Sequence, residues 1–170
     1  MDGLWTERLE LHRLSVGEAE RIVGRESRGS DRWAEGYPGD GDVAGARGFL
    51  SGWAARGDPG VFGAYEIRRR LDRVAVGGIG FHGPPDEGRF VTVGYGLVPG
   101  VRGQGYATEA LRALLELARA QGVAGAKGDA DLGNVASQRV MRAAGMRYAG
   151  EDERVRYYRV EFDGGSAREG

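Results

Sequence analysis

The stretch that decides the fold is residues 97–111, which read LVPGVRGQGYATEAL. An apolar, strand-like run stops at Pro99, glycines follow in quick succession, and strong helix formers come next. Glycine weakens a helix by about 1 kcal/mol, so glycines at this junction indicate a constraint on the backbone. The first N–H groups of a helix have no internal partners, and the helix dipole adds positive charge there. We therefore expect Gly103 and Gly105 to let main-chain amides approach a phosphate, with Arg102 as a nearby charge.

Composition excludes several classes of function. The chain has 170 residues and a 41% hydrophobic fraction, which suits one domain with a real core. A net charge of −1 argues against a nucleic-acid binder with a basic surface. There is no cysteine and there are two histidines, which excludes disulfides, thiolate catalysis and Cys- or His-rich metal sites. Neither a signal peptide nor a membrane span is recognisable, so we expect a cytoplasmic protein with no membrane partner.

Hydrophobic periodicity and turn signals predict a mixed order of elements in one domain, residues 1–162, followed by a flexible tail, 163–170. Early strands favour antiparallel hairpins, and the later strand–helix–strand unit favours a parallel pair. The expected strands cover 8–14, 61–67, 74–81, 90–98, 123–130, 146–149 and 155–162. Four helices are expected: one at 15–24 that begins with a capping box, one capped by Asp42 and ended by Gly57, one from Gly105 to Gln121, and one from Asn134 to Gly145. A polar loop with embedded aromatics spans 26–41.

Two familiar phosphate loops fit the glycine-rich junction poorly. A P-loop requires Gly-Lys-Ser/Thr, and no lysine lies here. A dinucleotide-binding fingerprint requires a third glycine where Thr108 stands, and it belongs in an open parallel sheet. A dinucleotide-dependent oxidoreductase is therefore a weak alternative.

The third option is a match to a known family. Residues 102–107, Arg-Gly-Gln-Gly-Tyr-Ala, match Gln/Arg-x-x-Gly-x-Gly/Ala, the pyrophosphate motif of the GNAT superfamily (Gcn5-related N-acetyltransferases). The longer string RGQGYATEAL resembles the branch that includes ribosomal-protein N-terminal acetyltransferases. A second stretch, DLGNVASQRVMRAAGM at 131–146, resembles that branch's Asn-x-x-Ser segment. The two stretches together form a strong signature.

The resemblance implies a fold and a cosubstrate. The fold is α+β, with a central mixed, mostly antiparallel sheet of about seven strands and helices on both faces. Two neighbouring strands splay apart, and acetyl-CoA lies in the gap; no metal is implied. The implied CoA-binding residues are Leu97 and Val98 for the pantetheine arm, Arg102, Gly103, Gln104, Gly105, Tyr106 and Ala107 for the pyrophosphate, and Asn134 and Arg139. A main-chain amide near Val98 is the implied donor to the oxyanion.

The catalytic residues are less clear from sequence. Many members of the family place a tyrosine acid where this chain has Met141, which leaves Ser137 as the hydroxyl that either protonates the thiolate or bonds the helix backbone. Close relatives often place a glutamate base where this chain has Thr92. His82 has a suitable unperturbed pKa for the base, although it is also explained as a surface loop residue. Tyr95 is expected to pack in the sheet.

The lack of a strong general base bears on which acceptor amine we expect. An α-amine with a pKa of about 8 is roughly a tenth neutral at pH 7, whereas a lysine of pKa about 10.4 is almost wholly charged. We therefore expect a peptide α-amine or a small-molecule amine to be acetylated by direct attack in a ternary complex. Candidates for the acceptor side are Trp33, Glu35, Tyr37, Asp40 and Asp42. The alternative function is a CoA-binding regulatory module without turnover. The resemblance also implies a bacterial protein and allows a homodimer.

Overall fold

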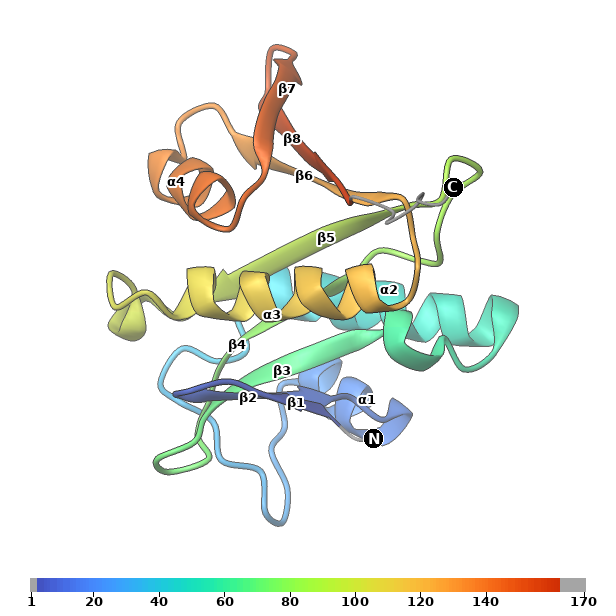
Figure 1. Ribbon diagram of the computed structural model, residues 1–170. Helices are drawn as coiled ribbons and strands as arrows, with labels where there is room; N and C mark the ends of the chain where they lie inside the picture. Colours follow the sequence, from blue (N-terminus) through green and yellow to red (C-terminus); the bar gives the residue numbers. More distant parts are fainter. Residues whose placement is uncertain (1–2, 163–170) are drawn as a thin grey trace.

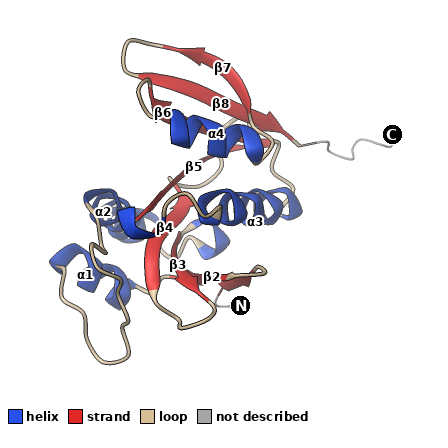
Figure 2. Ribbon diagram, turned by 90° about the vertical axis from the view of Figure 1, so that its left-hand side faces the viewer, coloured by secondary structure: helices blue, strands red, loops and turns tan. Residues whose placement is uncertain are grey.

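The computed structural model describes residues 3–162 and contains one central sheet with helices packed on it. The strands are β1 (Gly3–Trp5), β2 (Leu9–Arg13), β3 (Ala64–Arg69), β4 (Ala75–Phe81), β5 (Phe90–Leu97), β6 (Gly125–Asp131), β7 (Arg147–Glu151) and β8 (Val155–Glu161). The α-helices are α1 (Val16–Gly24), α2 (Asp40–Arg56), α3 (Tyr106–Ala120) and α4 (Val135–Ala143), with short 3₁₀ turns at Gly60–Phe62 and Pro99–Val101. Helices α1 and α2 cover one face of the sheet, and α3 covers the other (Figures 1 and 2).

The strand order is β1-β2-β3-β4-β5-β6-β8-β7. Every neighbouring pair is antiparallel except β5 and β6, which are parallel. That parallel pairing runs only from Phe90 to Thr92 on β5, against Gly125 to Lys127 on β6. Beyond these residues the two strands diverge, as Figure 1 shows. The later part of β5 therefore has one edge that no strand pairs, which places unpaired main-chain groups in the middle of the sheet.

The core lies between the sheet and α3. Side chains of alternate strand residues point to opposite faces, so Leu11 and Ile67, which pair across β2 and β3, share one face. Both are fully buried, as are Leu111 and Leu114 on α3. The other face of the same two strands carries charged residues, among them Glu10 and Glu66, both buried. The α3 side of the sheet is thus apolar, and the α1 side is polar near β2 and β3.

Most expected elements are confirmed, with two differences. Strand β1 was not expected, because three residues show no periodicity, and it brings the sheet to eight strands in the described chain rather than about seven. The prediction that Asp42 caps the second helix is wrong: α2 begins at Asp40 with Gly39 as N-cap, and Asp42 accepts a hydrogen bond from the Gly39 N–H. The capping box of Ser15 and Glu18 is confirmed.

The predicted tail, 163–170, lies outside the described residues. Between residues 3 and 162, none of the helices combines the length and apolar character needed to cross a bilayer.

Candidate active site

The glycine-rich junction forms the expected strand–turn–helix. Gly103 and Gly105 have φ angles of 82° and 84°, a left-handed region that favours glycine. No described residue accepts a hydrogen bond from the N–H groups of 103–107, and nothing lies within 4 Å of where a Gly103 side chain would start. These amides stand at the N-terminus of α3, where the helix dipole is positive. The loop therefore presents a run of free donors suited to a diphosphate.

Arg8 braces this loop from the β1–β2 turn. Its guanidinium donates to the Gln104 carbonyl (2.9 Å), pairs with Glu109 (2.7 Å) and lies 4.6 Å from the centre of the Tyr106 ring. Glu109 also accepts from the Thr6 hydroxyl (2.6 Å) and the Arg8 main-chain N–H (2.8 Å). Glu109 thus has a structural role, because it holds the β1–β2 turn against α3. The part played by Arg8 was not visible in the sequence, because some hundred residues separate it from the loop.

The register between β5 and β4 determines which main-chain N–H groups of β5 are free at its other edge. The His82 N–H donates to the Thr92 carbonyl, and the Val98 N–H donates to the Val76 carbonyl, both at 2.8 Å. Donors alternate along a strand, so the N–H groups of Tyr95 and Leu97 point the other way, toward β6. The expectation that an amide near Val98 donates to an oxyanion therefore does not hold for Val98 itself, whose N–H is already used.

Ser137 and Tyr95 meet where β5 and β6 diverge. Ser137 is in the first turn of α4, where its N–H donates to the side chain of Asn134, the N-cap (3.0 Å). Its hydroxyl lies 2.7 Å from the Tyr95 hydroxyl, which also donates to the Ser137 carbonyl (3.1 Å). The Ser137 hydroxyl is thus held by a side chain rather than by the helix backbone. Burial raises the pKa of Tyr95, although the Ser137 hydroxyl opposes the shift, so Tyr95 stays protonated at neutral pH.

Met141 is buried on α4, one turn after Ser137. Its sulfur would lie 3.4 Å from a Cβ on Gly128 of β6, in the space below α4. The Tyr158 hydroxyl is also buried, and it finds no hydrogen-bond partner in the described part of the chain. Buried hydroxyls are nearly always paired, so this unpaired hydroxyl is unusual for a core.

His82 lies on the opposite face of β5. Its ring rests on Gly94, such that a Cβ on Gly94 would meet the ring nitrogen Nε2 at 2.6 Å. Gly94 and Tyr95 are adjacent, so their side-chain directions oppose each other. The two predicted catalytic residues, His82 and Ser137, are therefore not brought together: they flank the same strand from the α2 side and the α4 side.

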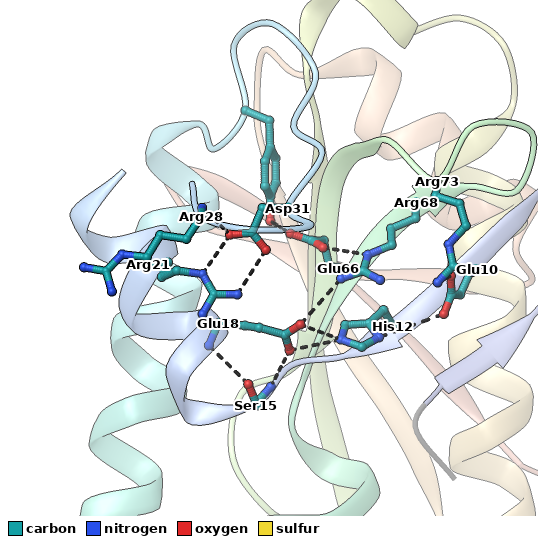
Figure 3. Close-up of polar contacts among 11 residues, drawn as sticks. Glu10, His12, Ser15, Glu18, Arg21, Arg28, Asp31, Glu66, Arg68 and Arg73 are labelled. Atoms are coloured by element: carbon teal, nitrogen blue, oxygen red, sulfur yellow. Dashed lines mark hydrogen bonds and ion pairs between the residues drawn. The ribbon is translucent and has the colours of Figure 1, made fainter. Parts of the chain in front are cut away.

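A chain of charged groups holds the loop before α2 against the sheet (Figure 3). The Tyr37 hydroxyl donates to Glu66 (2.8 Å), Glu66 accepts from Arg68 (2.8 Å), and Arg68 approaches Glu18 (3.6 Å). Glu18 in turn contacts His12 at 2.9 Å. Burial on its own would raise the pKa of Glu18, but hydrogen bonds from His12 and from the Ser15 N–H lower it to about 2.

The remaining predicted residues are placed as follows. Asn134, the N-cap of α4, and Arg139 on α4 are both exposed. Arg102 is also exposed and donates to the Leu97 carbonyl (3.1 Å). Of the acceptor-side candidates, Tyr37 is buried and Asp42 is half-buried. The others are Trp33, which is half-buried and bridges to Ala75, and Glu35 and Asp40, which are exposed. Over residues 3–162, no three His, Asp or Glu side chains are grouped to hold a metal.

Comparisons with known proteins agree with this geometry. An acetyltransferase (GNAT) domain family model matches residues 8–147. An acetyltransferase from Agrobacterium tumefaciens is 25% identical, with a TM-score of 0.67 over 94% of each chain. A ribosomal-protein-S5-alanine acetyltransferase from Vibrio fischeri is 13% identical, with a TM-score of 0.68 over 95% of this chain and 97% of that one.

A ribosomal L7/L12 alpha-N-protein acetyltransferase, solved in complex with coenzyme A, is 17% identical, with a TM-score of 0.65 over 94% and 97% of the two chains. A search of curated proteins gave no match. The structural likenesses establish the fold, and the family model covers most of the sequence. The resemblance read from residues 102–107 and 131–146 is confirmed: this chain belongs to the GNAT family of N-acetyltransferases.

Proposed function

We propose that the protein transfers an acetyl group from acetyl-CoA to a primary amine, either a peptide α-amine or a small-molecule amine, by direct attack in a ternary complex. The observation that carries the proposal is the run of unpaired N–H groups at 103–107, next to an unpaired edge of β5. These two features form a continuous line of main-chain donors and acceptors, which suits a diphosphate joined to an amide-bearing arm.

In this proposal the diphosphate binds the amides of 103–107, and Arg102 leaves the Leu97 carbonyl to meet it. The pantetheine arm then lies along β5 and pairs with the freed Leu97 carbonyl, so that the thioester reaches the N–H groups of Leu97 and Tyr95. One of these N–H groups donates to the oxyanion of the tetrahedral intermediate. Because the donors are fixed in the sheet, they need no reorganisation when the charge develops.

The leaving thiolate is protonated by Ser137 in this scheme. Tyr95 positions the Ser137 hydroxyl through their 2.7 Å contact and can pass a proton to it. The carbon–nitrogen bond forms, the carbon–sulfur bond breaks, and the sulfur takes the serine proton. A thiol with a pKa near 8.5 is a fair leaving group, so this acid lowers the barrier without being indispensable.

A peptide α-amine is the favoured acceptor. Thr92 supplies no base, so an amine of low pKa is easier to use than lysine. The structural neighbours support this choice, since one is an alpha-N-protein acetyltransferase and another a ribosomal-protein-alanine acetyltransferase.

The test is release of free thiol from acetyl-CoA across a panel of peptides with free α-amines, small amines, and N-terminally blocked lysine peptides. We expect turnover on α-amines or small amines to exceed that on lysine ε-amines. The Ser137→Ala and His82→Ala variants are assayed beside the wild type. An unchanged rate would remove Ser137 as the acid, or His82 as a candidate base. Equal or better turnover on lysine would reject the acceptor class, and binding of acetyl-CoA without turnover on any amine would favour a regulatory CoA-binding module.

A further inference from the structure

The α2-facing side of β4 and β5 is lined by glycine. Gly78 pairs with Gly96, and Gly80 pairs with Gly94, so all four residues share one face of the sheet. Glycine weakens a strand, and its use there commonly marks the close approach of another group. This face is opposite the Ser137 side of β5. Two consecutive cross-strand pairs on this face therefore carry no side chains.

Different groups lie above these glycines. A Cβ on Gly78 would be 2.7 Å from Asp42 Oδ1, and a Cβ on Gly94 would meet the His82 ring. Above Gly96 nothing lies within 4 Å, and Gly96 is exposed. Paired Cα atoms are about 5.5 Å apart, and next-but-one residues of a strand about 7 Å. Gly96 therefore has open space above it, with the Asp42 carboxylate on one side and the His82 ring on another.

That open space adjoins the reacting carbonyl of the proposed function. Gly96 lies between Tyr95 and Leu97, whose N–H groups are the proposed oxyanion donors. An amine approaching β5 from the α2 side would find no atom within 4 Å of the position of a Gly96 Cβ. A Cβ built on Gly36 would lie about 4 Å from the side chains of Val98 and Pro99, just after the strand, so the loop before α2 borders the same entrance.

We propose that Asp42 is the base that takes the proton from the acceptor amine, bound above Gly96, and so supplies the function that Thr92 lacks. This inference rests on the proposed function. The ammonium gives one proton to Asp42 Oδ1, and the neutral amine attacks the thioester carbon. The nitrogen loses its second proton to solvent as the tetrahedral intermediate collapses, and the thiolate is protonated from the Ser137 side. Asp42 returns its proton to water.

The surroundings of Asp42 suit this role. Its Oδ2 accepts the Gly39 N–H (2.8 Å), while no described residue donates to its Oδ1. Burial raises the pKa of Asp42 to about 6; the Gly39 hydrogen bond and Arg25 oppose this rise, and the negative charge of Glu66 adds to it. A base with a pKa near the working pH is efficient in proton transfer. Carboxylates nearby are less suitable, since Glu66 is engaged by Tyr37 and Arg68.

Asp42→Asn is the direct test, because the amide oxygen can still accept the Gly39 N–H and keep the helix start intact. Asp58→Asn is the matched control: Asp58 is exposed, pairs with Arg13 and accepts the Gly60 N–H, which an asparagine oxygen can still accept. We measure kcat and KM from pH 5 to 9 on an α-amine acceptor. Asp42→Asn should lower kcat by about 100-fold or more, with an unchanged KM for acetyl-CoA. Asp58→Asn should behave as the wild type.

The pH profile also separates Asp42 from His82, the other candidate base. The rate of the wild type should fall as pH drops through about 6, which gives the pH–rate profile an acidic limb. Asp42→Asn should lack this limb, whereas His82→Gln should keep it. Glu66→Gln removes a negative neighbour, which favours ionised Asp42 and should move the limb to lower pH.

A wild-type rate and limb in Asp42→Asn would overturn the inference and leave the proposed function standing. Loss of the limb in His82→Gln alone would assign the base to His82. Absence of turnover by the wild type on every amine would remove both proposals together.

Discussion

The contact between Ser137 and Tyr95 makes a quantitative prediction about the departure of the thiolate. If Ser137 is the acid, Ser137→Ala should lower kcat by about 100-fold, the low end of general-acid effects, because the thiol is a fair leaving group. The side chain of Tyr95 touches the reaction only through the serine. A neutral hydrogen bond of 2.7 Å is worth about 1 kcal/mol, so Tyr95→Phe should lower kcat by roughly 2- to 10-fold.

The double variant decides whether the two hydroxyls act as one unit. When Tyr95 works through Ser137, removing it has no further effect once the serine hydroxyl is gone, so the double variant should equal Ser137→Ala. The assay is thiol release at saturating acetyl-CoA and amine, with acetyl-CoA affinity measured separately by calorimetry. Effects that multiply in the double variant would refute the relay, and a Ser137→Ala rate within twofold of the wild type would refute the acid.

Three further predictions concern the parts that hold the site. Tyr37→Phe removes the donor to buried Glu66 and should lower the free energy of unfolding by about 1–3 kcal/mol, measured by urea denaturation; an unchanged value would mean that this bond contributes nothing net. The pKa of Glu18 is lowered to about 2 from 4.5, so its contribution to stability is present above pH 4.5 and is lost as pH falls toward 2; Glu18→Gln should flatten the dependence of unfolding on pH in that range, and an unaltered slope would contradict it. Glu109→Ala frees Arg8 and should lower the melting temperature and weaken acetyl-CoA binding, whereas a loss of kcat alone would contradict its bracing role.

The sequence was informative where local chemistry alone determines structure. The glycine-rich junction, the capping box at Ser15 and the end of α2 at Gly57 each depend on neighbours within a few residues, and the structure contains all three. The fold followed from two motifs that are characteristic of one family. Strand β1 was not predicted, because its three residues form a strand through pairing with β2 and show no hydrophobic pattern of their own.

The site was less predictable, because it depends on register and on contacts between distant residues. Whether the amide of Leu97 or of Val98 is free is set by a one-residue choice of pairing with β4, which no residue type reveals. The meeting of Tyr95 with Ser137 and the placement of Asp42 over Gly78 likewise join separate elements. Glycine at 78, 80, 94 and 96 was a possible signal, but the chain holds 32 glycines, which hid it.

The central claim is that free main-chain N–H groups at 103–107 hold the diphosphate of coenzyme A. The most direct measurement is the change in amide chemical shifts of the ¹⁵N-labelled protein on titration with coenzyme A and, separately, with pantetheine, which lacks the diphosphate. The account predicts that coenzyme A shifts the resonances of 103–107 strongly and that pantetheine leaves them in place while moving those of Tyr95 and Leu97. Resonances at 103–107 that stay fixed at saturating coenzyme A would contradict it.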